Sequence, residues 1–242
     1  MNRSNAWKRW TVYIAGIFIL ALGVFLNVKS ALGISTTNSV PNIVSVAGLR
    51  YGAPWLTLGT ACTIVYCIDM LFQCIVYRRI RMKVILQLPF SFIFGHIVDM
   101  YGSLLALLLN GAELALEVRV VLFAASVLLI SIGCTMVVNM DLVPNPPDGG
   151  VQALAHLTKL PFGRAKWLWD GILLFVTAGI SFLIGVPVLA PNNIYIGTII
   201  AFFAIGNIIH FVNNHFGAWF RDIFDRNDSV TCVPTDKEAV AN

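Results

Sequence analysis

Two short segments of the chain combine helix-capping residues with small polar side chains, and each could bind a polar solute. Their residues are Ser35, Thr36, Thr37 and Asn38 in the first segment and Asn145, Asp148, Gly149 and Gly150 in the second. Ser35 and Asn145 are suited to begin a helix, and Pro146 fits the first helical position. Free N–H groups at a helix start attract anions and other polar groups, and glycine lets a ligand approach the backbone closely. We therefore predict that these eight residues bind a substrate.

The charge of Asp148 limits what the second segment can bind. A carboxylate at a helix start opposes the attraction that the helix dipole exerts on an anion. Cations and zwitterions therefore stay among the candidate solutes. The alternative interpretation is that the run PNPPDGG, residues 144–150, is a rigid turn that caps a helix.

Ionisable side chains inside apolar stretches form a second set of candidates, because a charge in the membrane is costly and usually functional. His96 and Asp99 are three residues apart and share one face of a helix, and Asn207 and His210 repeat that spacing. The two faces could meet and line a polar path or a proton relay. The alternative is that these groups hold helices together by hydrogen bonds.

Asp69 and Asp170 are the other carboxylates within apolar stretches. Asp69 lies near the basic cluster that begins at Arg78, where its side chain can reach the membrane surface or pair. Asp170 lies near the start of its stretch, where a helix dipole favours negative charge. As a pair they would suit an intramembrane enzyme, but they occupy unmatched positions of the duplication described below, and we predict no enzymatic activity.

Composition identifies lipid as the solvent of these elements. The 242-residue chain is 58% hydrophobic and 12% charged, about half the charged fraction of a soluble domain. Crossing the hydrocarbon takes about 20 apolar residues in a helix, and six stretches approach that length, at 10–28, 55–76, 84–109, 118–140, 167–188 and 194–212. The two polar segments, 35–49 and 145–157, are too short to cross. The predicted fold is an all-α integral membrane protein with about six transmembrane helices and two re-entrant half-helices.

The distribution of positive charge supports six crossings with both termini in the cytoplasm. This topology places 13 of the 16 Lys and Arg residues inside and leaves Lys29, Arg50 and Arg119 outside, as the positive-inside rule requires. An eight-span alternative, in which both short segments cross, puts Arg164 and Lys166 outside. The first stretch is interpreted as an uncleaved span. Residues 216–242 are predicted to form an interfacial helix and a disordered cytoplasmic tail.

The two halves of the chain match each other. Gly23 and Gly133 lie 110 residues apart, and after one inserted residue near Pro161 the spacing becomes 111, as between Gly95 and Gly206. We predict two repeats, residues 1–112 and 113–215, each with three spans and one half-helix. An odd number of crossings inverts the second repeat relative to the first. Inverted repeats with broken helices are typical of transporters, and channels use the same plan.

Three segments resemble the YczE/YitT-type bacterial membrane proteins. They are LGVFLNVKSALGISTTNSVP at 22–41, FGHIVD at 94–99 and PNPPDGG at 144–150. The resemblance covers about residues 8 to 215, and that family shows an LG-(S/T) loop after the first span and an NP-x-DG motif after the fourth. Asn38 stands where many relatives carry Asp, which weakens the equivalence of the two sites. The resemblance implies a multi-pass protein of the bacterial cytoplasmic membrane and little about activity, since the family is largely uncharacterised.

Together these patterns predict a secondary transporter or facilitator of a small polar solute. The alternative is a non-transporting partner, such as a substrate-capture subunit or a scaffold of a transport or biosynthetic complex. Because the chain has no P-loop, ATP dependence would need such a partner. The five cysteines form no CxxC pair, so we expect neither a metal site nor a cofactor. The basic residues form short clusters, which indicates no nucleic acid. The expected partners are the bilayer and the solute, with homo-oligomers left open.

Overall fold

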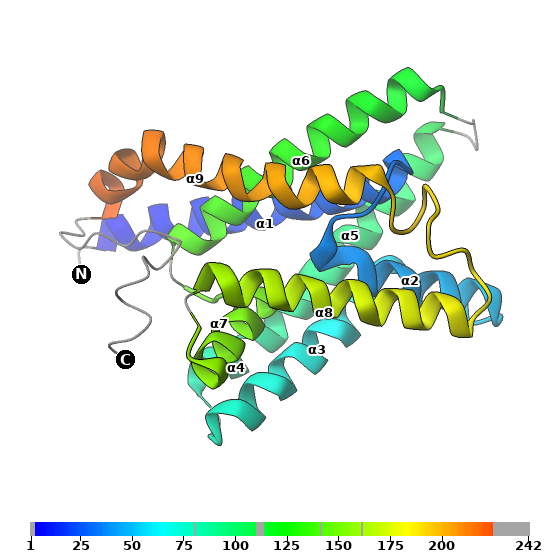
Figure 1. Cartoon of the computed structure of the whole chain (residues 1–242). Helices are drawn as coiled ribbons and strands as arrows, with labels where there is room; N and C mark the ends of the chain where they lie inside the picture. Colours follow the sequence, from blue (N-terminus) through cyan, green and yellow to red (C-terminus); the bar gives the residue numbers. More distant parts are fainter. Residues whose placement is uncertain (1–2, 80, 110–113, 141, 161, 225–242) are drawn as a thin grey trace.

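The computed structural model describes residues 3–79, 81–109, 114–140, 142–160 and 162–224 (Figure 1). Within these residues the fold is all-α and contains no strand beyond one isolated bridge between Leu189 and Ile194. The helices are α1 (Arg3–Ser30), α2 (Thr36–Arg50), α3 (Leu58–Tyr77), α4 (Met82–Ile85), α5 (Gln87–Leu109), α6 (Leu116–Asn139), α7 (Pro146–Thr158), α8 (Phe162–Leu183) and α9 (Ile196–Phe224). The predicted all-α membrane protein is confirmed.

Six helices are long and apolar enough to cross a membrane, and they coincide with the six predicted stretches. The helices α2 and α7 are not among them, because their 15 and 13 residues span only about 20 Å at 1.5 Å per residue. Hydrocarbon about 30 Å thick is wider than either helix is long. Figure 1 shows α2 directed toward one end of the bundle and α7 toward the other. Both helices therefore have the length and placement of half-helices.

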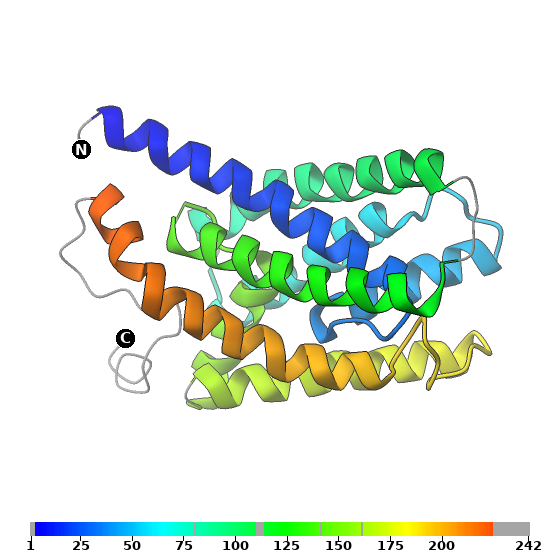
Figure 2. The same ribbon diagram turned by 90° about the horizontal axis from the view of Figure 1, so that it is seen from above.

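The packing of the helices follows the predicted duplication. The helix α1 packs along α6, and these two lie side by side in Figure 2. Around them the contacts come in matched pairs, since α2 packs on α8 as α7 packs on α3, and α1 packs on α5 as α6 packs on α9. The matched glycines lie at the centre, where a Cβ on Gly23 would be 2.7 Å from the Ile130 nitrogen and one on Gly133 would be 2.6 Å from the Leu20 nitrogen. Each glycine lets the other repeat's helix approach its backbone.

One pair of matched contacts differs between the halves. The helix α3 packs tightly on α5, where a Cβ on Gly95 would lie 2.5 Å from the carbonyl oxygen of Gly59. The equivalent pair, α8 and α9, has no comparable packing. Gly206, the repeat partner of Gly95, has no atom within 4 Å of its would-be Cβ. The α3–α5 interface is therefore closely packed, whereas the equivalent α8–α9 interface is open.

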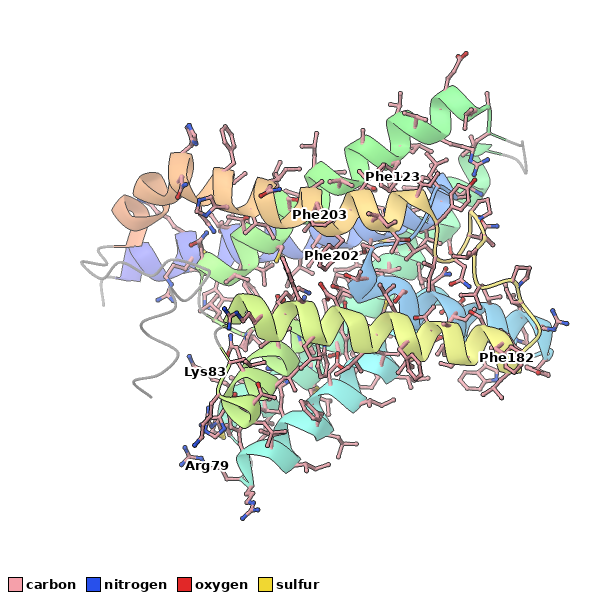
Figure 3. The ribbon with its side chains drawn as sticks, viewed as in Figure 1. Arg79, Lys83, Phe123, Phe182, Phe202 and Phe203 are labelled. Atoms are coloured by element: carbon pink, nitrogen blue, oxygen red, sulfur yellow. The ribbon has the colours of Figure 1, made fainter. Side chains whose placement is uncertain are left out.

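The C-terminal part departs from the prediction in one respect. The helix α9 continues without a break to Phe224, whereas a separate interfacial helix was predicted from residue 216. The predicted disordered tail, from residue 225 on, lies outside the described residues. Figure 3 places Arg79 and Lys83 at the end of the bundle that also holds the N-terminus. This clustering of positive charge agrees with the proposed topology, and the cytoplasmic orientation stays a prediction.

Candidate functional site

The starts of α2 and α7 line the same cavity, which has a volume of about 180 Å³. Its polar lining combines Ser35, Thr36, Thr37 and Asn38 from the first segment with Asn145 and Asp148 from the second. These six residues are among the eight that the sequence analysis predicted to bind a substrate. At about 30 Å³ per molecule of liquid water, the volume suits about six waters or a solute of several non-hydrogen atoms.

Hydrogen bonds from outside the helix fix the start of α2. The side-chain oxygen of Asn27 accepts the N–H of Ser35 at 2.8 Å, and the amide of Asn38 donates to the Ser35 hydroxyl at 2.8 Å. The first N–H groups of a helix have no intrahelical acceptor, and among the described residues none of the hydrogen bonds uses the N–H of Thr36 or Thr37. These two donors remain free where α2 meets the cavity.

The start of α7 has different chemistry because its first two residues are Pro146 and Pro147. Proline carries no backbone N–H, so this helix start lacks two of the donors that α2 offers. Asp148 lies in its first turn and is half-buried, with the thiol of Cys134 donating to its carboxylate at 3.9 Å. Asn145 is buried, and its side-chain oxygen has no hydrogen-bond partner among the described residues.

An ion pair on α8 completes the polar lining. The ammonium of Lys166 lies 2.8 Å from the carboxylate of Asp170, one helical turn away, and 3.5 Å from the Thr37 hydroxyl. The Asp170 side chain is only 4% exposed, whereas that of Lys166 is 30% exposed. Asp148 interacts with this pair electrostatically, being attracted by Lys166 and repelled by Asp170. The cavity thus holds one cation and two carboxylates.

The remaining walls are apolar, and α9 supplies many of them. Leu20, Val24, Ile130, Phe202, Ile205 and Ile209 line the cavity. The rings of Trp167 and Phe202 meet at 6.1 Å between α8 and α9, and Figure 3 shows Phe202 on the side of α9 that faces α8. Trp167 and Gly206 line the cavity and are exposed. The cavity therefore opens between α8 and α9, where the matched packing of α3 on α5 is missing.

Two predicted binding residues do not line the cavity. A Cβ on Gly149 would lie 2.5 Å from the Gln73 side chain, and one on Gly150 would lie 2.7 Å from the Trp169 ring. Both glycines are buried in the packing of α7 against α3 and α8. Their small size serves helix contact in this structure, and the close approach of a ligand that the sequence suggested does not occur at these positions.

The residues of the predicted polar path do not come together. His96, Asn207 and His210 are exposed on the outer faces of α5 and α9. The rings of His96 and His210 bond within their own helices, to the Phe92 carbonyl at 2.8 Å and to the Asn214 amide at 3.0 Å. None of the three lines the cavity. The physical reason is that α5 and α9 lie on opposite sides of the central α1–α6 pair, so their matched faces point away from each other.

Asp99 instead caps the start of α3. Its carboxylate accepts the Gly59 N–H at 2.8 Å and the Thr57 hydroxyl at 2.6 Å. A carboxylate at a helix start satisfies free N–H groups and complements the helix dipole. Asp99 therefore joins α5 to α3, as the alternative interpretation of the sequence suggested.

Replacing Asp99 with alanine tests this structural role. We expect a loss of about 2 kcal/mol in stability, because two hydrogen bonds to a charged acceptor disappear and the Gly59 N–H is left unpaired. Thermal unfolding in detergent measures the loss, with His96→Ala as the control of an exposed neighbour. Unchanged stability together with lost transport would indicate that Asp99 belongs to the predicted polar path.

The sequence analysis did not predict that Lys166 and Asp170 lie at the cavity. Lys166 was counted as a topology charge and Asp170 as a partner of the helix dipole, whereas both line the cavity. Their four-residue spacing, which places oppositely charged side chains on one helix face, was the available signal. Asp69 is buried in α3, within electrostatic range of Asp148 and Lys166. The part of the chain that the structure describes contains no group of metal-ligating side chains.

Comparison with known proteins adds a family and no activity. Residues 7–214 match a family described as a family of unknown function, DUF6198. No curated protein and no solved structure matches the chain. An uncharacterised family is what the resemblance implied, while the resemblance to the YczE/YitT-type proteins itself stays a prediction.

Proposed function

Because the chain belongs to the DUF6198 family, whose function is unknown, we propose its activity from the cavity: it is a secondary transporter or facilitator of a small polar solute. The observation that carries the proposal is the meeting of two half-helix starts at one cavity. Half-helices that meet inside inverted repeats form the solute sites of several transporter folds. A purely structural turn would not need a cavity with a lysine and two carboxylates in its lining.

The difference between the halves supports transport rather than static binding. The interface of α3 with α5 is sealed at Gly59 and Gly95, and the equivalent interface of α8 with α9 is open beside the cavity. Repeats that can exchange such packings give access to a central site from one side and then from the other. In this state the solute enters between α8 and α9. In the other state, α9 packs on α8 while α5 moves away from α3.

Transport by the purified full-length chain in proteoliposomes tests the proposal. Four probes cover the charge classes: β-alanine as the zwitterion, guanidinium as the cation, lactate as the anion and glycerol as the neutral solute. We expect facilitated uptake of at least one probe and a loss of about tenfold or more in Asp148→Asn, because Asp148 is the unpaired charge of the cavity. The matched control is Glu117→Gln, which changes an exposed carboxylate in the first turn of α6. Uptake by the wild-type protein that is no higher than in protein-free vesicles, or undiminished uptake by Asp148→Asn, would overturn the proposal.

A capture subunit is the second candidate, and the surface of α8 and α9 favours it. Among the six spans these two bury the smallest share of their residues, and Phe175, Phe182 and Phe203 are exposed on them. A partner helix could cover this face next to the opening of the cavity. Binding of a probe without any uptake by the reconstituted chain would favour this candidate over the transporter.

A further inference from the structure

The two helix starts that line the cavity carry opposite hydrogen-bonding chemistry. Where it meets the solute, the α2 start offers the free N–H groups of Thr36 and Thr37 and the neighbouring ammonium of Lys166, 3.5 Å from the Thr37 hydroxyl. An anionic oxygen suits this end, because N–H groups at a helix start and an ammonium group all favour negative charge.

The α7 start offers acceptors. Pro146 and Pro147 supply no N–H, and Asp148 adds a carboxylate whose side-chain donors in the described residues are the Asn145 amide and the weak Cys134 thiol. The side chain of Asn145 is 93% buried and lines the cavity, and its oxygen lacks a donor. The Asn145 amide lies beside Asp148, so its NH₂ faces the carboxylate and its oxygen is the atom left over. A buried acceptor without a partner is costly, which points to a ligand that donates hydrogen bonds here.

We propose that the cavity binds a small zwitterion, with a primary ammonium group at the α7 start and an anionic group at the α2 start; the inference rests on the proposed function for the solute site itself. The charges agree with this orientation. Lys166 and Asp170 form an ion pair at 2.8 Å, and with Asp148 as a second carboxylate the described lining keeps a net negative charge. A lone anion is repelled by Asp148, and a lone cation leaves the donors of α2 without an acceptor.

The volume of the cavity and its apolar lining restrict the class of zwitterion that can bind. The cavity volume of about 180 Å³ admits a short chain between the two charged groups and excludes a large ring system. The apolar side chains of Val24, Ile130 and Ile205 also line the cavity, and they would contact methylene groups of the ligand. Two sources share this chemistry: a short amino acid in solution and the ethanolamine phosphate headgroup of a lipid. The opening between α8 and α9 is compatible with both.

Calorimetric binding to the full chain in nanodiscs tests the inference. The probes are β-alanine and its two single-charge analogues, propylamine and propionate, followed by glycine and 4-aminobutyrate to vary the distance between charges. We expect one of the three amino acids to bind at least tenfold more tightly than both analogues. We also expect Asp148→Asn to weaken propylamine and the amino acid by about tenfold and to strengthen propionate, because the repulsion by Asp148 is removed. Thr37→Val, which removes the hydroxyl 3.5 Å from the Lys166 ammonium, is expected to weaken propionate and the amino acid without affecting propylamine. Thermal unfolding shows whether each variant is folded, and the opposite selectivity of the two isosteric variants would not arise from misfolding.

The other results have defined meanings. Propylamine binding as tightly as every amino acid would overturn the inference in favour of a cation site, and equal binding of propionate would overturn it in favour of an anion site. Nanodiscs with and without phosphatidylethanolamine separate the two sources: competition with the amino acid assigns the site to the lipid headgroup, and no competition assigns it to a soluble zwitterion. If no amino acid binds while glycerol or guanidinium is taken up by proteoliposomes, the zwitterion is wrong and transport stands. If no probe binds and none is taken up, both proposals fail.

Discussion

Replacing Gly95 with alanine is expected to destabilise the protein strongly, whereas the same change at its repeat partner Gly206 leaves stability unchanged. A Cβ on Gly95 would lie 2.4 Å from the Thr63 hydroxyl and 2.5 Å from the Gly59 carbonyl oxygen. The hydroxyl can rotate away, but the carbonyl belongs to the backbone of α3, so the two helices must separate. Small residues at such positions are what lets membrane helices pack closely.

The expected loss for Gly95→Ala is about 3 kcal/mol, the upper end of the usual cost of overpacking. Separation of the helices also weakens the hydrogen bond that the Thr63 hydroxyl donates to the Ser91 carbonyl at 3.1 Å. At Gly206 and Gly179 no atom lies within 4 Å of the new methyl group. Thermal unfolding followed by tryptophan fluorescence measures the three variants in the same detergent. A Gly95→Ala protein as stable as Gly179→Ala would show that α3 and α5 do not pack as described.

The same pair of variants connects stability to transport. If the repeats exchange packings, α9 approaches α8 in the second state, and an added methyl group on Gly206 obstructs that approach. The Gly206→Ala protein then unfolds at the normal temperature but transports more slowly. This combination would distinguish a static cavity, which tolerates the methyl group in both assays, from one that alternates.

The sequence predicted the elements of this fold better than their contacts. Spans and half-helices follow from hydrophobic length and capping residues, because the bilayer allows only helices to cross and fixes how long they must be. The repeat spacing also matched Gly23 with Gly133, and each of these glycines lies where α1 and α6 pack closely. These features depend on local composition or on a regular offset, and both can be read without coordinates.

The side on which a residue faces was harder to predict. His96 and His210 are ionisable and matched, yet both point outward, because the rotation of α5 and α9 about their axes is set by packing against α1 and α6. Gly149 and Gly150 looked like a ligand cradle, and the side chains of Gln73 and Trp169 occupy the space in front of them. Lys166 was attributed to topology alone, since only the tertiary structure brings it next to Thr37.

Replacing Lys166 with methionine is expected to produce the second large effect, and a larger one than replacing Asp170 with asparagine. Removing one partner of a buried ion pair leaves the other charge uncompensated, at a cost of about 3–5 kcal/mol. Asp170 is the deeply buried partner, with a side chain only 4% exposed. In Lys166→Met its carboxylate must stay charged in an apolar site or take up a proton, and either outcome reduces stability.

Asp170→Asn is expected to reduce stability less than Lys166→Met, because the Lys166 side chain that it leaves behind is 30% exposed and lies near other polar groups. In Asp170→Asn the ammonium keeps the Thr37 hydroxyl at 3.5 Å and the attraction of Asp148. Thermal unfolding of both variants measures the difference, and Arg164→Met, an exposed basic residue on the same helix, controls for loss of charge. Equal losses for Lys166→Met and Asp170→Asn would contradict the assigned burial.

The double variant Lys166→Met/Asp170→Leu separates stability from function. Replacing a whole buried pair with apolar residues is often neutral or stabilising, so we expect the fold to recover while uptake and probe binding stay lost. In the predicted duplication, Asp170 occupies the position that Gly59 has in the first half, 111 residues earlier. Glycine at that position lets α3 pack closely on α5, since a Cβ on Gly59 would collide with the Gly95 carbonyl oxygen, whereas Asp170 holds Lys166 at the cavity. Replacing both charged residues with apolar ones is therefore expected to keep the helix packing and to remove the charged part of the cavity lining.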